Sequence, residues 1–339
     1  MYKIVLMPGD GIGPELTATT LEVLHAIQDQ HNLSFRFINV DAGDACYARR
    51  GIALPSETVQ AIETSDACLK GPVGETAADV IVRLRLLFDL YANLRPLKSY
   101  PNAPSMRPDI DMLFVRENTE GVYRGLELNI DEDTAVCLRV ITRKGSERIA
   151  RYAFKMALER GKDLKVTAIH KSNVMRVTDG LFSKVCNEVA QDYPEISLQE
   201  LYVDAAAMEL IRSPHAFDVI VTTNMFGDIL SDEAAMTVGG LGMAPGANIG
   251  DRYALFEPIH GSAPSLAGKQ VANPTSMILA AKLMLEWLGS RHSDSALLKA
   301  AESLEDALTR TLLDKILTQD LGGTARTNEF GKAVAKNIR

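Results

Sequence analysis

Short apolar runs and segments with helical periodicity alternate along residues 1–90. Runs at Tyr2–Met7, 35–40 and 67–70 predict buried strands, because they have the length of a strand and are bounded by turn-forming residues. Between the first two runs, apolar residues recur close to every 3.6 positions and predict a helix that starts near Pro14. This alternation is typical of an α/β sheet with helices on its faces, and 339 residues correspond to about two domains.

The rest of the chain predicts a hairpin and then further alternation. The polar, turn-rich segment 125–133 leads into 136–142, where side chains alternate between two sides, so we expect a projecting hairpin arm. Breaks near 96–108 and 239–250 are the candidate domain boundaries. Helices are expected at 79–88, 146–160, 178–190, 205–212, 228–238, 275–289, 296–317 and 328–338, and strands at 165–170, 197–204 and 217–223.

The net charge excludes broad contact with polyanions. The chain has 36 basic and 44 acidic residues, a formal charge of −8, so it offers no extended positive surface to nucleic acid or to an anionic membrane. We therefore expect no nucleic-acid and no membrane partner, and an anionic ligand must meet a local cluster of cations. The four cysteines form no CxxC pair, no apolar run is long enough to span a bilayer, and the first residues lack the pattern of a signal peptide. These features predict a cytoplasmic protein with reduced thiols.

The first turn is rich in glycine but does not match the dinucleotide-binding fingerprint. Gly9, Gly11 and Gly13 follow the first expected strand, yet the spacing in GDGIGPE is not GxGxxG. Pro14 also lacks an N–H group that a bound anion would use. Two interpretations remain: a tight strand-to-helix turn, and a turn that lets a flat ligand approach the backbone.

Two aspartates four residues apart predict a cation site. Asp228 and Asp232 lie on one face of the helix expected at 228–238, about one turn apart. Hard oxygen ligands suit Mg²⁺ or Mn²⁺, and Asp204, at the end of an expected strand, is the candidate third carboxylate. The alternative is that the two carboxylates stabilise the helix dipole. The absence of a Cys/His cluster argues against zinc.

Three arginines predict an acidic ligand. Arg85, Arg95 and Arg116 lie near expected element ends, and a guanidinium is the natural clamp for a carboxylate, so a di- or tricarboxylate is indicated. Ile81 and Val82 are helical neighbours of Arg85 and would place an aliphatic patch beside it. The alternative is that each arginine pairs with an acidic residue on the surface.

Lys171 and Tyr123 are the candidates for proton transfer. Lys171 ends an expected buried strand, where desolvation and a nearby metal would lower its pKa enough for it to act as a base. Tyr123 would serve as an acid, and His260 is a further titratable candidate. For each of these side chains the alternative is an ordinary structural role.

Taken together, these segments resemble one enzyme family. The chain is similar to the β-decarboxylating dehydrogenases, which act on 3-isopropylmalate, isocitrate, homoisocitrate and tartrate or malate, and most of all to the archaeal-type isopropylmalate dehydrogenases. The similarity runs nearly from end to end. The matching segments are GDGIGPE (9–15), DLYANLRP (89–96), VRENTEGVY (115–123), HKSN (170–173), NMFGDILSDEAA (224–235), GGLGMAPGANIG (239–250) and FEPIHGSAP (256–264).

The resemblance implies the two-domain α/β/α fold of isopropylmalate dehydrogenases rather than a Rossmann domain. Residues 1–97 and 240–339 would form a discontinuous cofactor-binding domain, and 98–239 would form the substrate, metal and dimerisation domain. An arm near 124–142 would build a homodimer with shared active sites, with a tetramer as the alternative.

The resemblance also assigns roles to matching positions. Each active site would take Lys171 and Asp204 from the neighbouring subunit, and the catalytic pair would be Lys171 and Tyr123. Substrate would contact Ile81, Val82, Arg85, Arg95, Arg116 and Asp204, and Mg²⁺ or Mn²⁺ would be held by Asp204, Asp228 and Asp232. The cofactor would lie along Ile12, Thr76, Glu257, His260, Gly261, Ser262, Ala263, Ser265, Asn273 and Asp320.

Details of these motifs favour NAD as cofactor. NAD users of this family usually carry Asp after HGSAP and NADP users carry Lys-Tyr, whereas this chain has Ser265-Leu266. Gln319 and Gly323 stand where NADP users carry Tyr and Arg, so the chain lacks those groups for a 2′-phosphate. Arg326 is the nearby cation.

The helix before Arg85 favours 3-isopropylmalate as substrate, converted to 2-oxoisocaproate in leucine biosynthesis. Isocitrate users carry Ser and Asn where this chain has Asp79 and Ile81, and one kind of homoisocitrate user carries Arg where it has Val82. Aliphatic side chains there fit an isopropyl group. Asp79 and Arg83 leave homoisocitrate and isocitrate open, and D-malate is a further alternative. A catalytically silent regulatory subunit is the non-enzyme alternative, disfavoured because the expected Tyr, Lys and Asp residues are all present.

Overall fold

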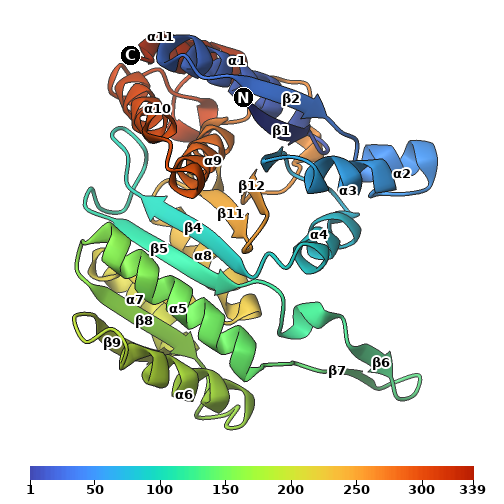
Figure 1. Cartoon of the computed structure of the whole chain (residues 1–339), viewed down its shortest axis with the longest axis vertical. Coiled ribbons are helices and arrows are strands. Elements are labelled where there is room, and N and C mark those ends of the chain that lie inside the picture. The colour runs from blue at the N-terminus through green and yellow to red at the C-terminus, as the bar shows by residue number, and fades with distance from the viewer.

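A single mixed sheet runs through the whole molecule. The computed structural model describes residues 1–339, and its sheet has ten strands with parallel outer parts and an antiparallel centre (Figure 1). In spatial order the strands are β2 (Phe35–Asn39), β1 (Tyr2–Met7), β3 (Ala67–Lys70), β12 (Ala254–Pro258), β11 (Pro245–Ile249), β4 (Ala92–Lys98), β5 (Asp111–Glu117), β10 (Val219–Thr222), β8 (Lys165–His170) and β9 (Ser197–Tyr202). The expected α/β class is therefore confirmed.

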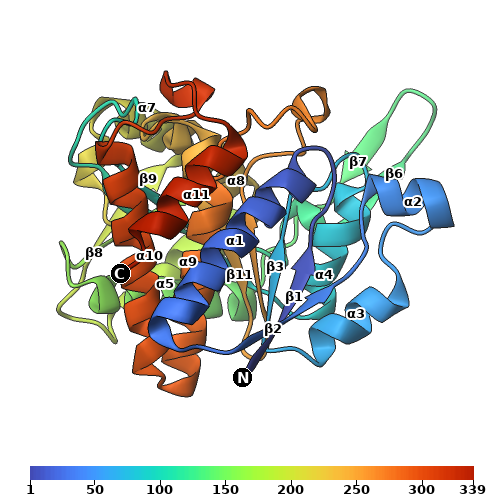
Figure 2. The ribbon, with the colours of Figure 1, turned by 90° about the horizontal axis from the view of Figure 1, so that it is seen from above.

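The two ends of the chain lie together on one part of this sheet. In both views the N-terminal helix α1 and the C-terminal helix α11 run side by side, and the middle of the chain forms the opposite part (Figures 1 and 2). The helices are α1 (Gly13–His31), α2 (Asp44–Arg50), α3 (Ser56–Glu63), α4 (Arg83–Leu87), α5 (Arg143–Arg160), α6 (Thr178–Ala190), α7 (Val203–Arg212), α8 (Asn224–Met236), α9 (Thr275–His292), α10 (Ser295–Leu313) and α11 (Thr327–Asn337). None of them is both long and apolar enough to span a bilayer.

Strand β10 illustrates why the middle part needs helices on both faces. Val219 and Val221 point to one face and pack in the cluster that includes residues of α5, whereas Ile220 points to the other and packs with residues of α8. All of its residues are buried, which explains the continuous apolar run in the sequence. The face covered by α8 is the one that carries the arginines described below.

The structure corrects several expected boundaries. The strand expected to end at residue 204 ends at Tyr202, so Asp204 lies in the first turn of α7. The helix expected at 228–238 begins at Asn224. The segment 239–250, expected to be a break, contains β11. Pro245 is tolerated there because it is the first residue of the strand. Helices α2 and α3 were not expected, since both are short and carry few apolar residues.

Two further expectations differ in detail. The helix expected at 79–88 is a π-helical turn over Ala78–Val82 followed by α4, an irregularity that is frequent at functional sites. The hairpin in the arm is confirmed, but its strands β6 (Glu127–Asn129) and β7 (Ala135–Cys137) are shorter than the alternation suggested.

The glycines of the first turn are explained by close packing of backbone. Gly9 and Gly11 have left-handed φ values of 70° and 56°. A Cβ atom on Gly9 would lie 2.0 Å from the carbonyl oxygen of Pro72, and one on Gly11 would lie 1.9 Å from that of Ser262. The glycines therefore let three loops of the protein meet, which supports the tight-turn interpretation.

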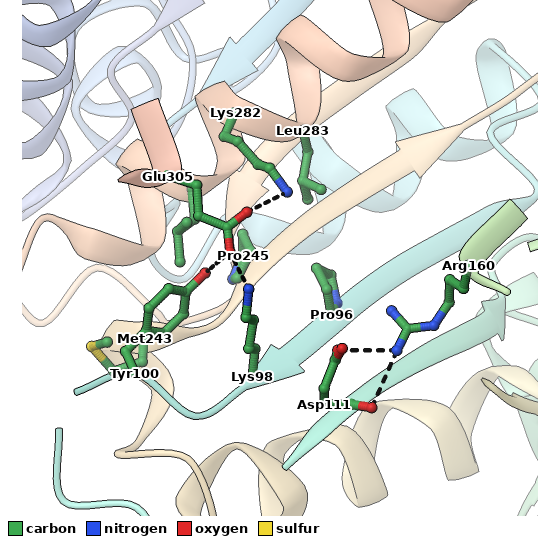
Figure 3. Close-up of a pocket in the computed structure, with 11 residues that line it drawn as sticks. Pro96, Lys98, Tyr100, Asp111, Arg160, Met243, Pro245, Lys282, Leu283 and Glu305 are labelled. Carbon is green, nitrogen blue, oxygen red and sulfur yellow. Dashed lines mark hydrogen bonds and ion pairs between the residues drawn. The ribbon is translucent and has the colours of Figure 1, made fainter. Parts of the chain in front are cut away.

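An ion cluster joins the end of β4 to helices α9 and α10. Glu305 accepts hydrogen bonds from Lys98 Nζ at 2.6 Å, Lys282 Nζ at 2.9 Å and the Tyr100 hydroxyl at 3.1 Å (Figure 3). Burial alone would raise the pKa of Glu305, but Lys282 and Lys98 outweigh it and lower this pKa to about 2. Because the folded pKa is lowered, Glu305 stabilises the fold above its ordinary pKa, and this contribution is lost as the pH falls towards 2.

Replacing Glu305 therefore has a pH-dependent effect on stability. We expect Glu305→Gln to lower the free energy of unfolding by about 2–3 kcal/mol at pH 7, and the difference from wild type to shrink between about pH 5 and pH 2. Urea unfolding at several pH values measures this difference. Glu147→Gln, in an exposed pair with Arg151, is the control and should change stability by less than about 0.5 kcal/mol. An equal loss at pH 3 and pH 7 would contradict the assignment.

Candidate active site

Two buried arginines meet two aspartates at the centre of the sheet. Asn93 of β4 is directly opposite Arg116 of β5, so the two side chains point to the same face of the sheet. Arg95 follows two residues after Asn93 and therefore points to that face as well. Arg95 Nη2 lies 2.9 Å from Asp228 Oδ1, and Arg116 Nη1 lies 2.5 Å from the same oxygen. Arg95 Nη1 also contacts Asp232 Oδ1 at 2.9 Å. Both guanidinium groups are nearly inaccessible to solvent, so the expectation of surface ion pairs does not apply to them.

Asp228 is the point where the charges converge. Burial would raise its pKa, but Arg116 and Arg95 lower it to about 2, so the carboxylate is charged throughout the physiological range. The Tyr123 hydroxyl donates a hydrogen bond to Asp228 Oδ2, and burial together with this bond raises the pKa of Tyr123. Tyr123 is therefore held in its protonated form beside the arginines.

The position of the aspartates in α8 weakens the helix-dipole interpretation. The helix begins at Asn224, so Asp228 and Asp232 lie beyond its first turn, where the dipole effect has fallen off. Their side chains are 34% and 48% exposed, so both are partly accessible to solvent. Burial raises the pKa of Asp232.

Arg85 lies on the same side but has different partners. Its Nε donates to Asn248 Oδ1 at 3.0 Å, and its Nη2 lies 3.5 Å from Glu257 Oε1. Glu257 also binds Lys70 Nζ at 2.7 Å. Burial would raise the pKa of Glu257, but Lys70 and Arg85 lower it to about 2. A residue predicted for the substrate and one predicted for the cofactor thus share a buried network.

Sequence reasoning missed the centre of that network, Asn248. Its side-chain oxygen accepts hydrogen bonds from Arg85, Asn93 and Asn118, and its amide donates to Glu257 Oε1 at 2.8 Å. The signal was present in ANIG, but the surrounding glycines concealed the strand.

The aliphatic pair before Arg85 divides between core and surface. Ile81 is buried in a cluster with Val80 and Leu84, whereas Val82 is only partly buried. Val82 is therefore the member of the pair with surface available to a ligand.

Lys171 and Asp204 form a second group of their own. Lys171 follows β8 directly, and its Nζ lies 2.5 Å from Asp204 Oδ1. Lys171 is only partly desolvated, since its side chain is 24% exposed in the single chain. Within one chain no three His, Cys, Asp or Glu side chains are grouped so that they could hold a metal ion. Asp204 therefore does not join Asp228 and Asp232 in the monomer.

The middle part of the chain carries a set of exposed apolar side chains. They lie on the arm and on helices α7 and α8. They are Leu126, Leu128, Ile130, Leu138, Met208, Ile211, Ile229 and Met236.

Most of the predicted cofactor residues lie on loops beside the first turn, whereas Glu257 lies in β12. The Ile12 N–H donates to the Ser262 carbonyl at 2.9 Å, and Asn273 Nδ2 donates to Asp320 Oδ2 at 2.9 Å. The Thr76 backbone and hydroxyl both donate to Asp44, at 2.8 Å, which fixes the loop before the π-helical turn. The structure thus brings loops from both ends of the chain together.

One buried group in these loops lacks a partner. His260 Nε2 is inaccessible to solvent and makes no hydrogen bond, and burial lowers the pKa of the imidazole. A Cβ atom at the adjacent Gly261 would meet nothing within 4 Å. Ala263 has a left-handed φ of 39°, and Ser265 is exposed. A ligand bound at these loops would supply the hydrogen-bond partner that His260 Nε2 lacks.

A family model described as isocitrate/isopropylmalate dehydrogenase matches residues 3–334 of this chain. The chain belongs to the isocitrate/isopropylmalate dehydrogenase family. It is thereby an oxidoreductase, a β-decarboxylating dehydrogenase, and membership of the family implies NAD and a divalent metal ion.

Relatives within the isocitrate/isopropylmalate dehydrogenase family match over their full length. The 3-isopropylmalate/3-methylmalate dehydrogenase of Methanocaldococcus jannaschii is 52% identical, with 100% of this chain and 99% of the relative covered. The 3-isopropylmalate dehydrogenase of Methanothermobacter thermautotrophicus is 50% identical, with 99% and 98% covered. The isocitrate/homoisocitrate dehydrogenase of Thermus thermophilus is 45% identical, with 100% and 99% covered.

A solved structure confirms the fold. The crystal structure of isocitrate dehydrogenase from Methylococcus capsulatus superposes with a TM-score of 0.93 at 41% identity, and each chain is covered completely. The family fold expected from the motifs, which is distinct from a Rossmann domain, is therefore correct.

Proposed function

We propose that this enzyme oxidises 3-isopropylmalate with NAD and releases CO₂ to give 2-oxoisocaproate, a step of leucine biosynthesis. The observation that carries the proposal is the meeting of Arg95, Arg116, Asp228 and Tyr123, with the aliphatic Val82 one helical turn before Arg85. Relatives with about half of their residues identical are named for this substrate.

The charges suit a substituted malate. Arg85, Arg95 and Arg116 would hold its two carboxylates, and the isopropyl group would lie against Val82. Burying three aliphatic carbons stabilises the complex by about 2 kcal/mol, whereas a carboxylate in the same place would be desolvated without a cation. Charged analogues would therefore be discriminated against more strongly than shorter alkyl analogues.

The residues fit the metal that the family implies. Asp228 is ionised and Asp232 is half exposed, and the carboxylates of both are hard oxygen ligands of the kind that Mg²⁺ and Mn²⁺ take. Asp204 of a second subunit would complete the set. A divalent cation bound there would polarise the substrate's C2 oxygen and stabilise the charge that develops on it.

Two side chains would move the protons. Lys171 of the neighbouring subunit would accept the proton of the C2 hydroxyl as the hydride leaves. Tyr123, kept protonated by burial and Asp228, would return a proton to C3 after CO₂ departs.

The loops around His260 would hold NAD. The unpartnered Nε2 of His260, the open space at Gly261 and the Asn273–Asp320 pair support this placement. The roles proposed for Ile12, Thr76, Ser262, Ala263 and Ser265 rest on the same loops, and that of Glu257 rests on its place in β12, which leads into them.

A homodimer would complete the site. The exposed apolar residues of the arm, α7 and α8 offer a surface for a second copy, and Lys171 and Asp204 lie ready-paired without a metal site of their own. We also propose the domain division at 97/98 and 239/240. The predicted boundary at 97 falls within β4, one residue before that strand ends at Lys98.

An initial-rate panel tests the function directly. The substrates are 3-isopropylmalate, homoisocitrate, isocitrate and D-malate, each with NAD or NADP and with or without Mg²⁺. We expect 3-isopropylmalate with NAD and Mg²⁺ to give the highest kcat/KM. Faster turnover of isocitrate would overturn the substrate assignment, and no turnover of any of the four would favour the regulatory-subunit alternative.

Val82 is expected to set substrate choice. Val82→Arg would lower kcat/KM for 3-isopropylmalate and raise it for homoisocitrate, changing their ratio by about 100-fold, because a cation would now meet the substituent's carboxylate. The measurement is kcat/KM for both substrates. Leu86→Arg, at an exposed position of the following helix α4, serves as control. An unchanged ratio in Val82→Arg would show that this face does not contact the substituent.

A further inference from the structure

A buried ion pair lies behind Lys171, outside the residues discussed so far. Asp179, in the first turn of α6, has a side chain with 0% exposure, and both of its carboxylate oxygens are engaged. Oδ2 accepts the backbone N–H of Lys171 at 2.7 Å, and Oδ1 pairs with Arg139 Nη1. The carboxylate therefore fixes the main chain of the lysine itself, at the point where β8 ends.

Arg139 comes from the base of the arm and reaches a third element. Its Nη2 donates to Thr223 Oγ1 at 2.8 Å, and Thr223 is the residue that precedes α8. Its guanidinium also lies 5.0 Å from the ring centroid of Phe226, within α8. One side chain thus joins the arm, the turn that carries Lys171 and the helix that carries Asp228.

This arrangement couples the turn that carries Lys171 to the helix that carries Asp228, two groups that do not meet within the monomer. Removal of Arg139 would leave the charge of Asp179 buried without its cation, so the carboxylate would shift or recruit water. Because that carboxylate holds the Lys171 N–H, the start of the lysine side chain would shift with it. A displacement of about 1 Å at a proton-transfer group is enough to slow a reaction substantially.

We infer that Arg139 and Asp179 are positioning residues for Lys171, and that the base of the arm thereby sets the placement of this lysine relative to α8. The inference rests on the proposed function, in which Lys171 is the base.

Kinetics of matched variants test the inference. Asp179→Ala removes both acceptors, and we expect it to lower kcat by about tenfold or more while KM for 3-isopropylmalate changes less than about threefold, because the arginine clamp is untouched. Asp179→Asn keeps an acceptor for the Lys171 N–H and should recover part of the loss. Arg139→Lys keeps a cation beside the carboxylate but lacks the second nitrogen that donates to Thr223. Its kcat should lie between those of Asp179→Ala and wild type.

The control is a second arginine–carboxylate pair that also ends on α6. Arg143 and Glu188 form an exposed pair between α5 and α6, and Arg143→Gln should leave kcat and KM unchanged. If Asp179→Ala lowers thermal stability but leaves kcat as in the control, the pair is structural only and the inference fails. If Asp179→Ala does not fold, Arg139→Lys decides in the same way.

Hydrogen exchange provides a readout that does not depend on turnover. The amide of Lys171 should exchange faster in Asp179→Ala than in wild type, and at the wild-type rate in Arg143→Gln. If no substituted malate is turned over by the wild type, the proposed function fails, and faster exchange still supports the positioning of Lys171. Unchanged exchange at Lys171 overturns the positioning even where turnover is present.

Discussion

Asp228→Asn is expected to lower kcat/KM for 3-isopropylmalate by about three orders of magnitude or more at saturating Mg²⁺. The carboxylate is where Arg95, Arg116 and Tyr123 converge, and we propose it as a ligand of the metal ion. An amide has the same shape but no charge. It therefore replaces the carboxylate neither as the partner of the two arginines nor as an anionic ligand of the metal ion. Initial rates over a range of Mg²⁺ concentrations measure the effect.

Two comparisons make this result specific. Asp109→Asn, in an exposed pair with Arg107, should retain wild-type rates. Wild-type enzyme stripped by a chelator should lose activity and regain it when Mg²⁺ is added, whereas Asp228→Asn should not respond. Activity of the variant within tenfold of wild type would show that the site does not depend on this carboxylate.

The second large effect concerns Lys171 and the dimer. Lys171→Gln alone should lower kcat by about 10²–10⁴-fold, since it removes the proposed base. If each site combines Asp228 of one chain with Lys171 of the other, a mixed dimer of the two inactive variants contains one intact site and one doubly defective site. Random mixing of the two variants should then restore about a quarter of wild-type activity.

The same experiment distinguishes shared sites from sites that are each formed by a single chain. If all residues of a site came from one chain, every site in the mixed dimer would carry one defect and no activity would return. The mixing requires reversible dissociation or coexpression, and sedimentation of the mixture checks that dimers have formed.

The α/β class and several motif positions could be predicted from the sequence because local signals determine them. The apolar run of β10 and the periodic apolar positions of α5 follow from burial on two faces of one sheet. Arg116 and Lys171 were expected near strand ends, and they lie at the ends of β5 and β8. The spacing of Asp228 and Asp232 puts both on one face of α8, although that helix begins earlier than expected.

What the sequence could not provide depends on contacts between distant segments. The register of β4 and β5, which turns Arg95 and Arg116 to the same face, is a property of pairing rather than of either strand. The burial of Asn248 among four polar partners, and of Asp179 behind Lys171, likewise depends on tertiary packing. The π-helical turn before Arg85 has no clear local signature, and it moves Ile81 into the core.

The pairing of both arginines with Asp228 has a consequence for how ligands assemble. Asp228, the anion proposed for the metal, pairs with Arg95 and Arg116, the cations proposed for the substrate. A malate carboxylate that takes over the guanidinium groups would release Asp228 towards the cation, and the cation would in turn release the guanidinium groups. Thermodynamic reciprocity then requires that each ligand tighten the affinity for the other by the same factor. Mg²⁺ and 3-isopropylmalate are therefore expected to bind synergistically. The arginine–aspartate pairs would be exchanged for arginine–substrate and aspartate–metal pairs, without a change in net charge.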